Sequence, residues 1–400
     1  MSYSFMGFCK EASGKDMQRE SKKIGADQAT TRRLDKRRRS IDEIDATLLD
    51  LINKRLSQAK EIGKIKEDHR APIRDNVRES EILERLLALN EGCLLSKTSL
   101  LQIFSDIVAA SRDIQKPSVS NTPSKEVPSV YVVMGNPIAH SLSPVMHNMA
   151  FRATQSNAVY IAVEVKDISS AITGFRNLHF KGASITIPYK VSVMEYLDDI
   201  DSSALSIKAV NTILKDNGRL VGFNTDCDGA VRALSEKTSI SGKKIAIIGA
   251  GGAARAIAYG ITSEKGSVTI LNRSRNKGEQ LARDLELNFR PLSECRHVKC
   301  DIVINATPVG MTPYVDEMPL PADFLENDMV VMDVVYSPLK TKLLKTAENI
   351  GCVTVDGISM FVYQGAKQFE LWTGLDAPLE IMKMVVTAAL EQKSSKARHA

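Results

Sequence analysis

The sequence is poor in cysteine and contains no long apolar run. Its 400 residues include six cysteines, too few and too scattered for a disulfide scaffold, so we expect reduced thiols. No apolar stretch reaches about 18 residues, the length of a membrane span, and no signal-peptide pattern follows Met1. Cys295, His297 and Cys300 lie close together but lack a second ligand pair at zinc spacing. These absences predict a cytoplasmic protein with no membrane span and no metal.

The composition is that of a folded protein with a small positive charge. Hydrophobic residues make up 43% and charged residues 25% of the chain, which excludes wholesale disorder and favours two or three domains. The formal net charge is +5, and residues 32–39 alone hold six basic residues against one acidic residue. Such a run is typical of a nucleic-acid patch, a solvated helix face or part of an anion-binding site. Composition does not decide among the three.

The first third of the chain predicts a helical domain over residues 32–115. Residues 1–31 are polar and lack an apolar period, so we interpret them as a flexible leader. Residues 34–66 contain no proline and place apolar residues at helical spacing, which predicts one long helix of about 50 Å. A helix of this length exceeds a small domain, so it should pack against a second chain. Two further helices are expected over residues 77–89 and 97–115.

The remainder has the alternating pattern of an α/β protein. Residues 116–128 contain three prolines and no apolar period, which indicates an extended linker. Short β-branched strands then alternate with helices, as in βαβ units. The expected strands include residues 130–133, 159–163, 183–187, 244–248 and 268–271.

Charged and polar residues of the helical domain fall where they can converge. Arg38, Arg55 and Lys66 lie along the long helix. Ser111 and Gln115, four residues apart, share one face of the third helix. Such residues suit a small polyanion, because arginine grips a carboxylate with two hydrogen bonds and stays charged.

Four segments of this domain resemble the all-helical chorismate mutase family: IDEIDATLLDLINKR, EIGKIK, PIRDNVRES and IFSDIVAASRDIQ. The resemblance implies an intertwined homodimer that rearranges chorismate to prephenate, a reaction that needs positioned cations and donors but no nucleophile. It also implies that Arg38 reaches the site of the other chain, which gives the basic run a role without nucleic acid. The implied roles are Arg38, Arg55 and Arg78 on the two carboxylates with Ser111 assisting, Lys66 and Gln115 on the ether oxygen, and Asp75 and Glu79 at the ring hydroxyl.

A glycine turn marks a dinucleotide site. The turn Gly249-Ala250-Gly251-Gly252-Ala253-Ala254 follows an expected strand and opens a helix, which fits G-x-G-x-x-A. Glycines let the backbone approach a pyrophosphate at the helix N-terminus. At the end of the next strand, where an NAD enzyme has an acidic residue, this chain has polar and basic residues that favour the 2′-phosphate of NADP. The cofactor candidates are Gly249, Gly251, Gly252, Ala253, Asn272, Arg273, Ser274 and Lys277.

Longer motifs of the α/β part resemble shikimate dehydrogenase. They are GNPIAHSLSPVMHN, SITIPYK, AVNT, NTDCDG, NATPVGM and DGISMFVYQGAKQFELWTG, in that order. The resemblance implies NADP-dependent interconversion of 3-dehydroshikimate and shikimate, with Lys190 and Asp226 as the pair that handles the hydroxyl proton. Which of the two is the formal acid or base stays open. The implied substrate contacts are Ser141 and Ser143 at the carboxylate with Tyr336 nearby, and Thr186, Asn211 and Gln364 at the ring hydroxyls.

Several residues near these motifs bear on the substrate. We expect His140 and His147 to position other groups rather than to act as bases. Ser184, Lys208 and Cys227 stand where the family commonly has Asn, Gly and Gly. None of the three removes an implied catalytic group, but they leave the choice between shikimate and quinate open.

The sequence therefore predicts a multidomain chain in which an all-α intertwined domain precedes an α/β dehydrogenase. We expect a substrate-binding domain over residues 129–231, completed by helices over residues 357–394, and a Rossmann-type NADP domain over residues 232–356. The expected function is bifunctional, in aromatic amino-acid biosynthesis, with a homodimer and without nucleic acid. The alternative is a single shikimate or quinate dehydrogenase with a non-catalytic helical dimerisation or regulatory module. Because the two reactions are not consecutive, we expect no direct channelling between the two parts, and we expect shared expression or feedback control to be the reason for the fusion.

Overall fold

The computed structural model describes residues 14–116 and 127–398, and the chain divides into two compact units. The first unit contains residues 14–73 and 110–116, and the second contains residues 74–109 and 127–398. Most of the linker predicted over residues 116–128 therefore lies outside the described residues. Within the described ranges, no helix has both the length and the apolar character needed to cross a bilayer.

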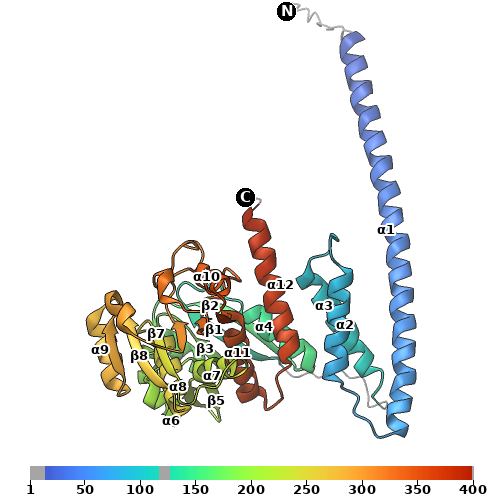
Figure 1. Ribbon diagram of the computed structural model, residues 1–400. Helices are drawn as coiled ribbons and strands as arrows, with labels where there is room; N and C mark the ends of the chain where they lie inside the picture. Colours follow the sequence, from blue (N-terminus) through green and yellow to red (C-terminus); the bar gives the residue numbers. More distant parts are fainter. Residues whose placement is uncertain (1–13, 117–126, 399–400) are drawn as a thin grey trace, which may run out of the picture. The chain divides into compact units, whose positions relative to one another are not determined.

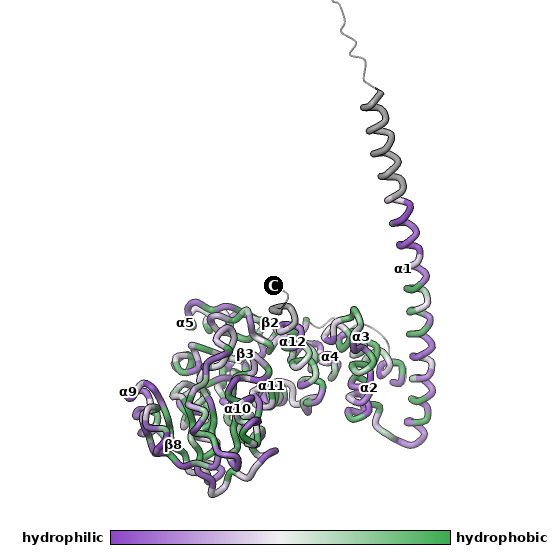
Figure 2. The backbone as a smooth tube through the Cα atoms, turned by 45° about the horizontal axis from the view of Figure 1, so that its top comes forward, coloured by the Kyte–Doolittle hydropathy of each residue, from purple (hydrophilic) through white to green (hydrophobic). Residues whose placement is uncertain are grey.

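The first unit is built on one long helix, α1 (Gly14–Asp68), drawn in blue in Figure 1. The expectation of a flexible leader does not hold for residues 14–31, which are helical, while residues 1–13 lie outside the described part. Lys, Arg, Glu, Gln and Ala are frequent in this segment, and these residues favour helix even without an apolar period. Figure 2 shows that the coloured part of α1 starts hydrophilic and that apolar positions recur further along it.

Helices α2 (Asn76–Leu89) and α3 (Lys97–Asp113) lie where the apolar spacing predicts them. They run beside each other in both backbone views (Figures 1 and 2), and we call residues 76–109 the α2–α3 hairpin. Leu83 and Leu101 on its apolar faces are almost fully buried. The hairpin belongs to the second unit.

The second unit contains a six-stranded sheet in the order β2-β1-β3-β5-β6-β4. Strands β1, β2 and β3 are parallel, β5 and β6 form an antiparallel hairpin, and β4 is parallel to β6. Its strands are β1 Ser129–Gly135, β2 Ala158–Glu164, β3 Phe180–Ile185, β4 Asp199–Ile200, β5 Thr212–Asp216 and β6 Arg219–Phe223. The helices interspersed with them are α4 Ser143–Thr154, α5 Ile168–Asn177, α6 Ser202–Ile207 and α7 Asp226–Ser235.

A second sheet has six parallel strands in the order β12-β11-β10-β7-β8-β9. The chain leaves β7 toward β8 on one side and returns to β10 on the other, so the strand order reverses beside β7. Such a switch point opens a crevice at the carboxyl ends of the strands. The strands are β7 Lys244–Ile248, β8 Ser267–Asn272, β9 Asn288–Pro291, β10 Ile302–Asn305, β11 Val330–Asp333 and β12 Val353–Val355. The helices of this part are α8 Gly252–Ser263, α9 Arg275–Asp284 and α10 Lys342–Ile350.

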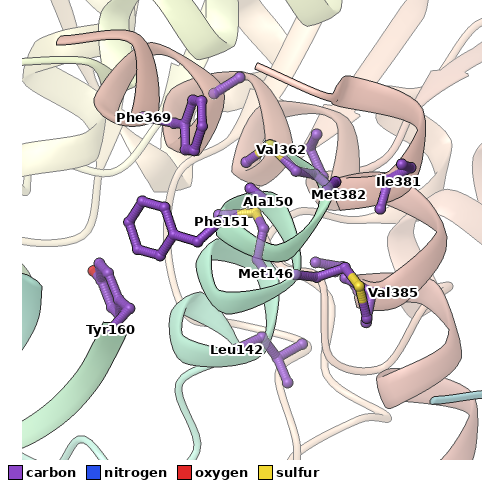
Figure 3. Close-up of a cluster of buried hydrophobic side chains, with 14 of the residues drawn as sticks. Leu142, Met146, Ala150, Phe151, Tyr160, Val362, Phe369, Ile381, Met382 and Val385 are labelled. Atoms are coloured by element: carbon purple, nitrogen blue, oxygen red, sulfur yellow. The ribbon is translucent and has the colours of Figure 1, made fainter. Parts of the chain in front are cut away.

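Two C-terminal helices, α11 (Gly357–Thr373) and α12 (Leu379–Arg398), pack against α4 beside the first sheet. Figure 3 shows Met146 of α4 facing Val362 of α11 and Met382 of α12. These side chains belong to one buried apolar cluster that also includes residues of β1 and β2. The C-terminal helices therefore complete the part of the fold that begins at β1.

The α2–α3 hairpin adds its apolar side chains to this same cluster. Leu83 and Leu101 are buried together with Met149 of α4. Two ion pairs lie at the rim, Lys97 with Glu391 at 2.9 Å and Asp106 with Arg152 at 3.0 Å. Exposed ion pairs contribute about 0–1 kcal/mol, whereas burial of a leucine contributes about 1.5–3 kcal/mol. Apolar packing therefore joins the hairpin to α4 and α12.

Candidate active sites

A cavity of about 920 Å³ opens at the switch point of the second sheet. The loops that follow β7, β8 and β10 line one side, and residues 186–191, which follow β3 of the first sheet, line another. Ligands of open α/β sheets bind at such crevices. The lining includes the glycine turn over residues 249–253 together with Asn272, Arg273, Lys277 and residues 306–309.

The glycine turn joins β7 to α8 and fits a pyrophosphate. Gly249 has φ +120°, a conformation that favours glycine. Gly251 precedes α8, and both Gly252 and Ala253 line the cavity at the helix N-terminus, where free amide groups attract an anion. A Cβ atom on Gly252 would lie 3.3 Å from Lys190 Cδ. The turn therefore contacts Lys190 and leaves room for a dinucleotide beside it.

Cations gather after β8, on the wall of the same cavity. Arg273 and Lys277 are exposed and line the cavity together with Asn272. The Asn272 side chain donates to Ser274 O at 2.8 Å and so fixes the turn. Ser274 precedes α9 and does not line the cavity. Two flexible cations at this place fit the extra phosphate of NADP better than a bare ribose.

Lys190 and Asp226 form a close ion pair at this cavity. Lys190 Nζ lies 2.5 Å from Asp226 Oδ2, and the two side chains are 17% and 9% exposed. Lys190 lies in the cavity-lining segment after β3, and Asp226 is the first residue of α7, where the helix dipole favours a carboxylate. The fold thus brings together a cation and a carboxylate that can hold or pass a proton.

Asn211 belongs to the same cluster, because it binds the second oxygen of Asp226. Asn211 Nδ2 donates to Asp226 Oδ1 at 2.9 Å. Its own Oδ1 accepts a hydrogen bond from Thr225 N at 2.8 Å. The side chain is 2% exposed. Asn211 therefore lies in direct contact with the carboxylate of the ion pair.

Three other residues predicted to contact substrate lie at the ends of β3 and of α4. Thr186 follows β3 and lines the cavity. Ser143 begins α4, and Ser141 Oγ accepts a hydrogen bond from Ser143 N at 3.3 Å. Both serines thus lie at a helix N-terminus, an environment that favours a carboxylate.

Gln364 and Tyr336 share one neighbour, Phe361 of α11. Gln364 Nε2 donates to Phe361 O at 2.8 Å, and the rings of Tyr336 and Phe361 have centroids 4.8 Å apart. Burial raises the pKa of Tyr336, so its phenol stays protonated. The roles of both residues toward a substrate remain predictions of the sequence.

The two histidines of the first motif lie in different surroundings. His147 is completely buried, and its ring stacks on Tyr160 with centroids 4.5 Å apart. Burial lowers the pKa of His147 to about 3, so its imidazole is neutral near physiological pH. His140 is exposed, and its carbonyl accepts a hydrogen bond from Lys393 Nζ at 3.2 Å. A packing role, and not that of a base, fits His147.

Two of the three departures from the dehydrogenase pattern have polar partners, and the third, Cys227, is a half-buried free thiol. Ser184 is buried and accepts a hydrogen bond from Tyr160 at 2.6 Å. Lys208 has φ +57° and pairs with Asp284 of α9 at 2.8 Å, an ion pair that lowers the pKa of Asp284 to about 2. Burial raises the pKa of Cys227 to about 12. Lys208 thus links α6 to α9.

In the first unit, Ser111 contacts two other predicted mutase residues, Arg55 and Gln115. Arg55 Nη1 donates to Ser111 Oγ, and Gln115 Nε2 donates to Ser111 O at 2.9 Å. Lys66 Nζ donates to Ile73 O at 2.7 Å. Burial lowers the pKa of Arg55, although a guanidinium stays charged at neutral pH. The unit therefore brings an arginine, a serine and a glutamine together, with a lysine further along α1.

Arg38 lies apart from this group. It precedes Arg55 by 17 residues (55 − 38) on α1, which is roughly 25 Å at 1.5 Å per residue. Its side chain is exposed and pairs with Asp35 at 3.3 Å. Because the helix is continuous, Arg38 does not reach Arg55 of its own chain.

In the second unit, the other predicted mutase residues lie at the start of α2. Asp75 is the N-cap, and its carboxylate accepts a hydrogen bond from Arg78 N at 3.0 Å. Arg78 is exposed and pairs with Glu81 at 3.2 Å. Glu79 is 8% exposed. The capping bond occupies one Asp75 oxygen, a local role that the ring-hydroxyl prediction did not include.

The motif NATPVGM, over residues 305–311, follows β10, and its residues 306–309 line the cavity next to Gly249 of the glycine turn. Asn305 Oδ1 accepts a hydrogen bond from Thr307 Oγ1 at 2.7 Å, and Asn305 Nδ2 donates to Val309 O at 3.1 Å. Behind the turn, Asp333 accepts from Asn305 at 2.9 Å. The sequence signal for this part of the cavity was a polar motif directly after a parallel strand. Because β10 pairs with β7, the ends of the two strands meet at the same edge of the sheet.

Four family models match the chain. "Chorismate mutase type II" matches residues 37–116. Three dehydrogenase models follow it: "Shikimate dehydrogenase substrate binding domain" over residues 133–213, "Shikimate / quinate 5-dehydrogenase" over residues 232–338, and "Shikimate 5'-dehydrogenase C-terminal domain" over residues 357–387. The matches thus cover both the helical and the α/β part.

Individual proteins match as well. The shikimate dehydrogenase (NADP(+)) of Methanothermobacter thermautotrophicus is 43% identical over 273 residues, which cover 65% of this chain and 96% of that relative. The structure of shikimate 5-dehydrogenase from Thermus thermophilus in complex with NADP(H) and shikimate has a TM-score of 0.61 at 33% identity and covers 65% of this chain and 99% of that one. A chorismate mutase/shikimate 5-dehydrogenase fusion protein from Clostridium acetobutylicum has a TM-score of 0.62 at 28% identity, with 66% and 99% covered.

Proposed function

Because the chain belongs to the shikimate dehydrogenase family and also carries a chorismate mutase type II domain, we propose that it is a bifunctional enzyme. One activity rearranges chorismate to prephenate, and the other interconverts shikimate and 3-dehydroshikimate with NADP. The observation that carries the dehydrogenase is the Lys190–Asp226 pair beside a cavity with a glycine turn. The corresponding observation for the mutase is the group of Arg55, Ser111 and Gln115.

For the dehydrogenase, NADP supplies the hydride acceptor or donor when it is bound. Lys190 and Asp226 hold the substrate hydroxyl and take its proton as a unit when the alcohol is oxidised, and they return it in the reverse direction. The glycine turn holds the pyrophosphate, and Arg273 and Lys277 hold the 2′-phosphate. The substrate is anchored by Ser141, Ser143 and Tyr336 at its carboxylate and by Thr186, Asn211 and Gln364 at its hydroxyls.

For the mutase, the reaction is intramolecular, so the residues have only to hold a compact conformer and to stabilise growing charge. Arg55 and Ser111 hold a carboxylate, and their existing hydrogen bond supports that placement. Lys66 and Gln115 donate to the ether oxygen, where negative charge grows as its bond to carbon breaks. The assignment is completed by Arg38 of a second copy and by Arg78, Asp75 and Glu79 at the start of α2.

A homodimer through α1 is part of the proposal. Large apolar side chains recur along α1 at separations of three, four, seven and eleven residues, and about half of each is exposed in the single chain. Exposed apolar stripes with heptad spacing favour association with another helix. They are Leu34, Ile41, Ile44, Leu48, Leu51, Ile62 and Ile65.

Replacing Leu48 by glutamate is expected to convert the dimer into monomers, because a charge would have to be buried in the apolar stripe. Light scattering coupled to size-exclusion chromatography measures the mass. Leu49→Glu is the matched control, since Leu49 is exposed but lies outside the heptad positions. A dimer that survives Leu48→Glu unchanged would exclude this face as the interface.

Cofactor preference provides a second test. Arg273→Ala is expected to raise the KM for NADP about ten- to a hundred-fold and to change the KM for NAD little, because a charged hydrogen bond to the 2′-phosphate is lost. Arg275→Ala is the control, since Arg275 pairs with Glu279 and does not line the cavity. Equal losses with both cofactors would show that Arg273 does not read the 2′-phosphate.

The bifunctional assignment is tested on the purified full chain with two assays, prephenate formation from chorismate and NADPH formation from shikimate. Turnover in both supports the proposal. Dehydrogenase turnover without mutase turnover, in a dimeric chain, would favour the alternative of a non-catalytic helical dimerisation or regulatory module. The same dehydrogenase assay with quinate in place of shikimate shows which of the two alcohols the enzyme prefers.

The domain limits and the location belong to the same proposal. We place the helical domain over residues 32–115, the substrate-binding domain over residues 129–231 with residues 357–394, and the NADP domain over residues 232–356. The described cysteines are free thiols, and this supports the proposal that the protein is located in the reducing cytoplasm.

A further inference from the structure

A chain of hydrogen bonds leads through the protein interior to Asp226 Oδ1, the carboxylate oxygen that Lys190 does not bind. Its members come from β2, β3, α11 and the segment around β5, far apart in the sequence. Each side chain donates to the next one, in a single direction. The links are Tyr160 OH to Ser184 Oγ at 2.6 Å, Ser184 Oγ to Gln368 Oε1 at 2.8 Å, Gln368 Nε2 to Thr212 Oγ1 at 2.9 Å, Thr212 Oγ1 to Asn211 Oδ1 at 2.7 Å, and Asn211 Nδ2 to Asp226 Oδ1 at 2.9 Å.

The members of this hydrogen-bond chain are almost closed to solvent. Buried polar groups must find protein partners, and a hydroxyl that accepts one bond has a single proton left to donate. Gln368 donates to Thr212, and Thr212 Oγ1 donates to Asn211 Oδ1 at 2.7 Å, a closer contact than the 3.3 Å between Thr212 Oγ1 and Thr225 Oγ1. The exposed fractions are Tyr160 1%, Ser184 6%, Gln368 1%, Thr212 0%, Asn211 2% and Asp226 6%.

The orientation of the Asn211 amide is the step that matters for Asp226. An asparagine amide has an oxygen on one side and an NH₂ group on the other, and a half-turn exchanges them. Two donors, Thr212 Oγ1 and Thr225 N at 2.7 and 2.8 Å, meet the oxygen. They leave the NH₂ group to face Asp226. With the amide reversed, its oxygen would face the carboxylate, and two acceptors would meet without a proton between them.

We propose that Thr212 and Gln368 are positioning residues of the dehydrogenase, which lock the Asn211 amide and thereby hold Asp226 against Lys190. The inference rests on the proposed dehydrogenase function. Lys190 binds Asp226 Oδ2, and Asn211 binds Oδ1, so the carboxylate is gripped at both oxygens. Loss of the hydrogen bond from Asn211 lets the Asp226 carboxylate rotate, which separates Asp226 from Lys190. Neither Thr212 nor Gln368 has to touch the substrate for this effect.

The test compares Thr212→Val, which keeps the shape but removes the hydroxyl, with Thr212→Ser, which keeps the hydroxyl. We expect Thr212→Val to lower kcat for shikimate oxidation about ten- to a hundred-fold, the range for a lost hydrogen bond to a charged network, without a change in the KM for NADP. Thr212→Ser is expected to retain most of kcat. Rates are counted per NADPH-binding site, measured by fluorescence titration, so that loss of folded protein does not count as loss of kcat.

Three outcomes would overturn the inference. Full kcat in Thr212→Val shows that the hydroxyl is not needed, and a Thr212→Ser variant as slow as Thr212→Val shows that packing of the methyl group matters instead. If Thr212→Val does not fold, Gln368→Met is used instead, because it removes the donor to Thr212. An unchanged kcat in Gln368→Met would also overturn the inference. Thr269→Val, in β8 of the other sheet, is the matched control. A wild-type chain without shikimate oxidation would instead refute the proposed function itself.

Discussion

Replacing Lys190 by alanine is expected to lower kcat for shikimate oxidation by about 10²- to 10⁴-fold, the range for loss of a general acid or base. The Lys190 ammonium lies 2.5 Å from Asp226, and the carbon stem of Lys190 lies beside Gly252 of the glycine turn. Without Lys190, the pair that takes the substrate hydroxyl proton is incomplete. Asp226 is then a largely buried carboxylate without its cation. Asp226→Asn is expected to cause a loss in the same range, since an amide cannot take up the proton.

Initial rates of NADPH formation with saturating shikimate measure this loss. Lys181→Ala is the matched control, because Lys181 is an exposed lysine of β3. Prephenate formation by the same preparation should stay at the wild-type rate, which separates a local effect from unfolding. Lys190→Ala with more than half of the wild-type kcat would remove Lys190 from the reaction.

Replacing Arg55 by alanine is expected to lower the mutase rate by about 10²- to 10³-fold, the loss for one electrostatic donor in a preorganised site. Arg55 is half buried and held by Ser111, so its charge is placed before a ligand arrives and costs little further entropy on binding. Arg55→Lys is expected to recover only part of the rate, since an ammonium cannot bind a carboxylate with a two-pronged fork.

Loss of chorismate absorbance, together with prephenate formation, measures the mutase rate. Lys54→Ala is the control on the adjacent position, because Lys54 is exposed and pairs with Asp50. Dehydrogenase activity and dimer mass should both be unchanged in Arg55→Ala. If mutase turnover persisted in that variant, the helical site would have to be assigned to other residues.

The sequence predicted well those features that depend on neighbours in the chain. The turn after β7 follows from three glycines between an apolar strand and a helix, and the cavity forms there because parallel strands end at one edge. Lys190 and Asp226 are 36 residues apart (226 − 190), and their pairing was predictable only through the family resemblance. Spacing alone gives no reason for them to meet.

Features that depend on distant partners were not predictable. Gln368 meets Thr212 across 156 residues, and neither position stands out by residue type or local pattern. Asp75 carried a predicted ligand role, whereas an aspartate directly before a helix is also the usual N-cap. The helical start of α1 was not predictable from an apolar period, because residues 14–31 are helical without one.

The α2–α3 hairpin bears on how such a fusion is inherited. Leu101 lies on the helix that also carries Ser111, and it is buried in the cluster of α4 and α12. A single lesion at Leu101 would therefore reduce the cellular amount of both enzymes at once. Recombination that cut the gene at the linker would leave the dehydrogenase half with an uncovered apolar surface, prone to aggregation. Besides the continuous polypeptide, the packing of the hairpin therefore opposes a later separation of the two fused genes.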